Sequence, residues 1–133
     1  MKNFNLMILA AGYGKRMRHL TQAVPKPLLK INNRELLSYN IDFFIKLGCN
    51  QIVINTHYLH NKIKIFVEKK FSNQNINLIF EPELLNTGGG IKNALSYFGE
   101  KNFLVTNSDI LWNDDNRKDI NDFISEYQKI KFC

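Results

Sequence analysis

The chain has 133 residues, of which 44% are hydrophobic and 23% are charged, and these values are ordinary for a globular domain. They exclude a largely disordered chain, and the length is sufficient for one domain with its own core. The net charge of +6 occurs without a dense basic run interleaved with aromatic residues, so the pattern disfavours nucleic acid as a partner.

Short apolar strands alternate with amphipathic helices along the chain. The pattern predicts strands over residues 6–11, 51–55, 76–80 and 103–106, and helices over 35–47, 59–71, 90–98 and 118–130. This alternation predicts an α/β fold, Rossmann-like with three layers and a mainly parallel sheet. The doubly wound strand order is 3-2-1-4, which places a ligand crevice between the first and fourth strands, outside their carboxyl ends.

The first predicted strand runs into a loop that contains Gly12, Gly14, Lys15 and Arg16. Glycines allow the backbone to approach a ligand closely, and loop amides with fixed cations bind phosphate. The spacing is not that of a Walker A loop, because Arg16 follows Gly14-Lys15. It is not a dinucleotide fingerprint either, because Met17 stands where the third glycine belongs.

Two further charged residues occupy positions that restrict them. Lys26 lies between Pro25 and Pro27, which stiffen the backbone on both sides and limit where the lysine points. Asp109 follows the fourth apolar strand, where a carboxylate serves as a turn cap or as a metal ligand. The predicted strand order brings the loop after residue 11 and Asp109 into one crevice.

Three separated motifs resemble those of the sugar-1-phosphate nucleotidyltransferases. Residues 9–28, LAAGYGKRMRHLTQAVPKPL, follow the family pattern L-A-A-G-x-G-x-R-M-x-P-L-T-x-x-x-P-K-P-L, with His19 in place of a proline. Glu81 with residues 85–90 (LNTGGG) and the segment Asn107-Ser108-Asp109 match in the same order. The resemblance covers the chain and implies a GT-A-like nucleotidyltransferase fold.

The resemblance also implies roles for individual residues. Arg16 and Lys26 would be the catalytic cations at the phosphates, and Asp109 would be a ligand of Mg²⁺. The nucleotide would be bound by Leu9, Ala10, Ala11, Gly12, Gly14, Lys15, Glu81, Thr87 and Gly88. For Glu81 a structural role stays open, and His57 is expected to be structural, because a sugar phosphate is already an anionic nucleophile and needs no base.

The reaction implied is transfer of a nucleotidyl group from UTP or GTP to a sugar 1-phosphate, which gives an NDP-sugar and pyrophosphate. The motifs are most similar to those of N-acetylmuramate-1-phosphate uridylyltransferases and, next, of mannose-1-phosphate guanylyltransferases. Residues 1–133 are expected to be the nucleotide-binding N-terminal portion of the domain, without the second metal carboxylate. The alternative is a non-catalytic nucleotide-binding fragment that needs a second chain supplying the C-terminal half.

The cysteines and the apolar runs indicate a compartment. Cys49 and Cys133 have no metal-ligand spacing, and two cysteines do not make a disulfide framework. The apolar stretch at 6–11 is too short for a signal-peptide core, and no run reaches transmembrane length. We therefore expect a cytoplasmic protein with reduced thiols and no membrane partner.

Overall fold

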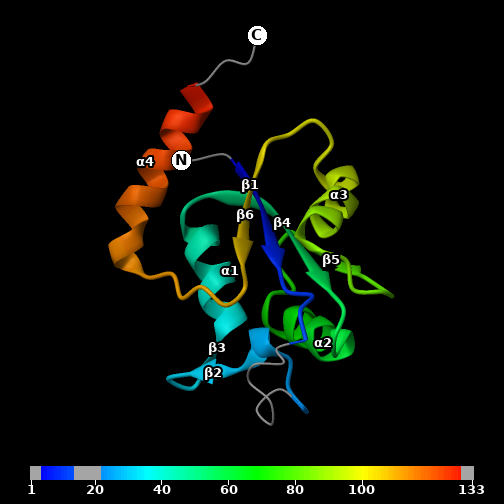
Figure 1. Cartoon of the computed structure of the whole chain (residues 1–133). Coiled ribbons are helices and arrows are strands. Elements are labelled where there is room, and N and C mark those ends of the chain that lie inside the picture. The colour runs from blue at the N-terminus through cyan, green and yellow to red at the C-terminus, as the bar shows by residue number, and fades with distance from the viewer. Residues whose placement is uncertain (1–3, 14–21, 130–133) are drawn as a thin grey trace.

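The structure is a computed structural model that describes residues 4–13 and 22–129, with the side chain of Lys129 excluded. Its main sheet has the order β5-β4-β1-β6, with every pair parallel (Figure 1). The strands are β1 (Phe4–Leu9), β4 (Cys49–Thr56), β5 (Ile76–Phe80) and β6 (Phe103–Asn107). The predicted strand order is thereby confirmed.

Helices cover both faces of the sheet. Leu6 and Ile8 of β1 pack with buried residues of α1 (Leu36–Lys46), α2 (His60–Lys70) and α4 (Arg117–Lys129). Met7, between them, faces the other way and packs against Ala94 and Phe98 of α3 (Thr87–Phe98). Side chains alternate across a strand, so this single apolar strand serves two cores, and the result is the predicted three-layer arrangement (Figure 1).

Most predicted bounds differ from the observed ones by one or two residues, and two of the differences lie at the predicted crevice. The first strand ends at Leu9 rather than at Ala11, because its pairing with both neighbours stops there. The third helix begins at Thr87 rather than at Gly90, because Asn86 caps it: its Oδ1 accepts a hydrogen bond from Gly89 N at 2.7 Å. The glycines at positions 88–90 therefore belong to the helix and do not form a loop before it.

Several short elements were not predicted from the sequence. A 3-10 turn, η2 (Lys26–Leu28), leads into a hairpin of β2 (Lys30–Ile31) and β3 (Arg34–Glu35), and a second turn, η3 (Asp114–Asn116), precedes α4. The hairpin turn places Asn32 and Asn33 at φ values of 53° and 62°. Asparagine tolerates this left-handed region, but strands of two residues show no periodicity that a pattern could reveal.

No helix within the described ranges is long and apolar enough to cross a membrane.

Cys49 opens β4, and its thiol donates a hydrogen bond to the carbonyl oxygen of Gln51 at 3.3 Å. Burial raises the pKa of this thiol to about 12, and a backbone hydrogen bond from Gln51 that favours the thiolate offsets only part of the rise. Because the thiolate is the reactive form, we expect Cys49 in a Cys133→Ser variant to react at least about 100-fold more slowly with a disulfide reagent at pH 8 in the native chain than in urea. Equal rates in the two states would contradict this expectation.

Candidate functional site

A cleft of about 760 Å³ opens at the carboxyl ends of β1 and β6, at the predicted crevice. Its walls come from four segments far apart in the sequence and from one strand-end side chain, Asn55. The segments are the end of β1 with the loop after it, the start of η2, the loop into α3, and the end of β6: residues 9–13, 26–27, 84–87 and 107–109.

Most of the predicted site residues within the described ranges line this cleft. They are Leu9, Ala10, Ala11, Gly12, Lys26, Thr87 and Asp109. Gly88 is exposed in the first turn of α3, next to the lining residue Thr87. Gly14, Lys15 and Arg16 lie outside the described residues.

The two predicted charged groups face each other. Lys26 Nζ lies 3.0 Å from Asp109 Oδ2, although 83 positions separate the residues in the sequence. Both side chains are partly open to solvent, with exposed fractions of 32% and 45%. The cleft therefore holds a paired cation and anion that an incoming phosphate and metal ion would each be able to engage.

Lys26 is held by the turn in which it lies. Pro27 is buried, and the carbonyl oxygens of Pro25 and Lys26 accept hydrogen bonds from Leu28 N at 2.9 Å and from Leu29 N at 3.1 Å. A further hydrogen bond connects the residue after this turn to α1, because Leu36 N donates to Leu29 O at 2.9 Å. The position of the lysine backbone is thus tied to the start of a core helix.

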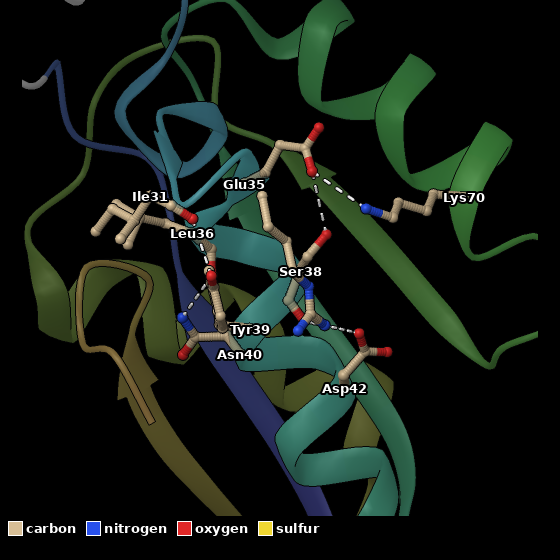
Figure 2. Close-up of polar contacts among 9 residues, drawn as sticks. Ile31, Glu35, Leu36, Ser38, Tyr39, Asn40, Asp42 and Lys70 are labelled. Atoms are coloured by element: carbon tan, nitrogen blue, oxygen red, sulfur yellow. Dashed lines mark hydrogen bonds and ion pairs between the residues drawn. The ribbon is translucent and has the colours of Figure 1, made fainter. Parts of the chain in front are cut away.

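Side chains around the start of α1 reinforce this tie (Figure 2). Tyr39 donates from its hydroxyl to Ile31 O at 2.9 Å, and Lys70 Nζ of α2 lies 3.2 Å from Glu35 Oε2. Burial alone would raise the pKa of Glu35, but hydrogen bonds from its own backbone and from Lys70 outweigh burial and lower it below its usual value. The β2–β3 hairpin is therefore clamped to two helices.

Glu81 lies beneath the cleft and does not line it. Its side chain is buried, with an exposed fraction of 1%, and its carboxylate accepts hydrogen bonds from Asn55 Nδ2 at 2.9 Å and from Leu85 N at 3.2 Å. Asn55 Oδ1 in turn accepts from Ala10 N at 2.9 Å. This places Glu81 in the support of the loops that line the cleft, and the arrangement agrees with the structural role left open by the sequence.

His57 joins the same support. Its Nδ1 lies 2.6 Å from Glu81 O, and because a carbonyl only accepts, Nδ1 carries the proton. In the neutral ring Nε2 then accepts from the Tyr13 hydroxyl at 2.8 Å. The imidazole connects the loop after β1 to the end of β5, and this arrangement agrees with a structural role.

The capped end of α3 forms another wall. Asn86 and Thr87 both line the cleft, so the first turn of the helix borders it. A helix N-terminus carries partial positive charge and favours an anion nearby. The cleft therefore combines a lysine, a helix N-terminus and a glycine-containing loop, each of which suits phosphate.

The oxygen donors at the cleft are compatible with Mg²⁺. Among the described residues there is no group of three or more His, Cys, Asp or Glu side chains that would hold a metal without help. Mg²⁺ does not require such a group, because it is commonly held by one or two carboxylates together with phosphate oxygens and water. Asp109, which is 45% exposed at the cleft, fits as one such carboxylate.

Two residues of the site and its surroundings, Asn55 and Trp112, were not predicted from the sequence. Asn55 is the last residue of the strand predicted at 51–55 and the penultimate residue of β4, and a polar residue at the end of an apolar strand also drew attention to Asp109, so the pattern could have revealed it. Trp112 lies in the loop between β6 and η3, where its ring stacks on Phe43 with centroids 5.6 Å apart and its Nε1 donates to Thr106 Oγ1 at 3.2 Å. It thus fastens the segment after Asp109 to α1 and β6.

A family model and the curated relatives point to the same protein family. The model of the nucleotidyl transferase family matches residues 5–133. The chain is 36% identical over 112 residues to D-glycero-alpha-D-manno-heptose 1-phosphate guanylyltransferase of Aneurinibacillus thermoaerophilus, covering 84% of this chain and 49% of the relative. It is 40% identical over 108 residues to N-acetylmuramate alpha-1-phosphate uridylyltransferase of Neisseria meningitidis serogroup B, covering 79% and 46%. The chain thus spans about half the length of these curated relatives.

Solved structures have the same fold. HddC from Yersinia pseudotuberculosis superposes with a TM-score of 0.76 at 30% identity, covering 92% of this chain and 54% of that protein. A UDP-glucose pyrophosphorylase complexed with UDP-glucose superposes with a TM-score of 0.77 at 23% identity, which supports the fold alone. The fold, the cleft at its switch point and the match over residues 5–133 together establish that this chain belongs to the nucleotidyl transferase family.

Proposed function

We propose that this chain binds a magnesium-bound nucleoside triphosphate in the cleft and serves in the transfer of its nucleotidyl group to a sugar 1-phosphate. The observation that carries the proposal is the meeting of Lys26, Asp109 and the loop after β1 at one sheet edge. Relatives named as sugar-1-phosphate guanylyl- and uridylyltransferases support it, as does a structure of HddC complexed with GMP-PN. GTP and UTP are therefore the first nucleotides to test.

The residues of the chain have distinct tasks in this proposal. The ammonium of Lys26 turns from Asp109 to the phosphates, where it offsets the negative charge that the two anionic reactants bring together. Arg16, by the family resemblance, adds a second cation with a planar fork that suits phosphate oxygens. Gly12 lets the backbone after β1 approach the phosphates, and the loop at 84–87 receives the base.

Asp109 would hold Mg²⁺ through its carboxylate. When bound, the ion supplies charge neutralisation at the phosphate oxygens and helps to align them for in-line attack. An oxygen of the sugar 1-phosphate attacks the α-phosphorus of the triphosphate. The new bond between this oxygen and the α-phosphorus forms as the bond from the α-phosphorus to the β-phosphate oxygen breaks, and pyrophosphate departs. The chain's own contribution is to position the two anions and to lower their repulsion.

A non-catalytic role in nucleotide binding is the second candidate, in which a separate chain completes the enzyme. The observation in its favour is that the chain spans about half the length of the relatives that it matches. The two candidates differ in turnover: an enzyme releases pyrophosphate from UTP with N-acetylmuramate 1-phosphate, or from GTP with mannose 1-phosphate. A nucleotide-binding portion binds the triphosphate and releases little or no pyrophosphate until a chain that carries the other half of the relatives' length is added.

Calorimetric titration of the folded chain with UTP, GTP and dTTP in the presence of Mg²⁺ tests the shared first step. We expect binding of at least one nucleotide in the micromolar to millimolar range. The absence of heat with all three nucleotides at millimolar concentration, in a chain shown to be folded by circular dichroism, would contradict the proposal.

Replacing Lys26 with alanine should weaken nucleotide binding by about 10- to 100-fold. The change removes one charge-assisted contact to phosphate, which is worth roughly 1.5–3 kcal/mol. Lys69→Ala, at an exposed position in the last turn of α2, removes the same charge from outside the cleft and serves as the matched control. Equal affinities of Lys26→Ala and Lys69→Ala for the nucleotide would remove Lys26 from the site.

A further inference from the structure

Asn40 is a polar residue in the buried face of α1. Its exposed fraction is 0%, and its helical neighbours Leu37, Ile41 and Phe44 belong to the main core. Burying an amide among apolar side chains is unfavourable unless its polar atoms are bonded. The position therefore calls for an explanation in terms of what the amide holds.

The Asn40 amide group reaches the turn that carries Asp109. Its Nδ2 lies 3.1 Å from Ser108 O and 3.1 Å from Ile110 O, the two carbonyl oxygens on either side of Asp109. It also lies 3.2 Å from Leu36 O in its own helix (Figure 2). Because carbonyl oxygens only accept, the donating nitrogen must face them. The side-chain oxygen Oδ1 is buried without a partner among the residues that the structure describes.

Other contacts hold this turn from the sheet side. Ser108 N donates to Leu9 O at 3.1 Å, which continues the pairing of β6 with β1, whereas Ile110 N reaches Asn107 O only at 3.4 Å. Asn40 grips the turn from the α1 side, through the two carbonyls that flank the aspartate. Of the described side chains with printed hydrogen bonds, only that of Asn40 bonds the backbone on both sides of Asp109.

We infer that Asn40 is a positioning residue for Asp109, which it holds with its carboxylate toward Lys26 and the phosphates, and that it thereby strengthens binding of a divalent cation together with the nucleotide. The inference rests on the proposed function, in which Asp109 binds that cation. An apolar residue of similar size would fill the same space in the core but would leave the carbonyl oxygens of Ser108 and Ile110 without this donor. The amide is therefore explained by its hydrogen bonds to the turn and not by packing in the core.

The test compares nucleotide affinity with Mg²⁺ and with EDTA, by calorimetry, for the whole 133-residue chain and the nucleotide that it binds best. The ratio of the two affinities reports the contribution of the metal. Asn40→Leu should reduce this ratio at least about 10-fold, as changes behind a metal ligand commonly do, while the affinity in EDTA stays within about twofold of wild type. Ile41→Val, a conservative change at the adjacent fully buried position, should leave both affinities unchanged.

If Asn40→Leu does not fold, Asn40→Ser takes its place, because its hydroxyl is too short to bridge both carbonyls and it disturbs the core less. An unchanged ratio in either folded variant would overturn the inference and leave the proposed function intact. Failure of the wild-type chain to bind any nucleotide would refute the proposed function, and the inference with it. Nucleotide binding by the wild type without any dependence on Mg²⁺ would overturn the inference and the proposed metal role of Asp109, and would leave nucleotide binding in the cleft intact.

Discussion

Replacing Asn55 with leucine should lower the free energy of unfolding by about 3 kcal/mol. The amide of Asn55 is buried and bonded at both ends, to Ala10 N at 2.9 Å and to Glu81 Oε1 at 2.9 Å. Leucine fills similar space but leaves a buried amide hydrogen and one oxygen of a buried carboxylate without these partners, and both losses carry the full desolvation penalty. Urea unfolding followed by circular dichroism measures the change.

Asn77→Leu is the matched control for this prediction. Asn77 lies in the adjacent strand β5 and is only partly buried, and its Oδ1 accepts from Gln51 Nε2 at 3.2 Å. We expect a loss below about 1 kcal/mol there, because water can replace the missing partner. The double variant Asn55→Leu/Glu81→Leu should lose less stability than the sum of its single changes, since neither partner then remains unpaired. Strict additivity would contradict the coupling of Asn55 to Glu81.

Replacing Gly90 with alanine should also destabilise the fold, by about 2 kcal/mol. A methyl group at Gly90 would lie 2.8 Å from Asn55 Nδ2 and 3.2 Å from Glu81 Oε1. Both neighbours are fixed by hydrogen bonds and cannot withdraw without breaking them. The crowding therefore outweighs the roughly 1 kcal/mol that alanine gains over glycine inside a helix.

Gly88→Ala separates crowding from helix propensity. Gly88 lies two residues earlier in α3, and a methyl group there would meet only Asn86 Oδ1, at the ordinary contact distance of 3.6 Å. Its stability should stay equal to that of wild type or rise slightly. Thermal unfolding of the two variants side by side measures the difference, and equal midpoints would show that α3 shifts outward without cost.

The sheet could be predicted from the sequence because the strands are short apolar runs separated by helices. The alternation admits few topologies, and the right-handed crossover rule leaves the doubly wound order as the natural one. The same rule placed Asp109 opposite the loop after β1. Lys26 could be singled out because two prolines restrict its backbone, although its pairing with Asp109 depends on α1 and could not be foreseen from local sequence.

The support beneath the cleft could not be predicted in the same way. Glu81 gives no sign in the sequence that it is buried, because acidic residues are seldom buried and its partners lie at Asn55 and at the backbone of Leu85. The start of α3 was misplaced because three successive glycines favour a loop by intrinsic propensity. The cap from Asn86 and the packing of Gly90 over Asn55 override that propensity.

The two charged groups at the cleft share one support: Leu29, which follows η2, accepts a hydrogen bond from Leu36 N at the start of α1, and the turn of Asp109 is bonded to the same helix through Asn40. A small displacement of α1 therefore acts on both groups at once, and their separation of 3.0 Å should change less than either absolute position, although the hydrogen bond from Ser108 N to Leu9 O also holds the turn of Asp109 to β1. Because both groups are attached to one helix, a movement that they share changes their spacing less than a movement of either group alone. Substitutions that shift α1 against the sheet should consequently affect thermal stability before they affect the spacing of Lys26 and Asp109.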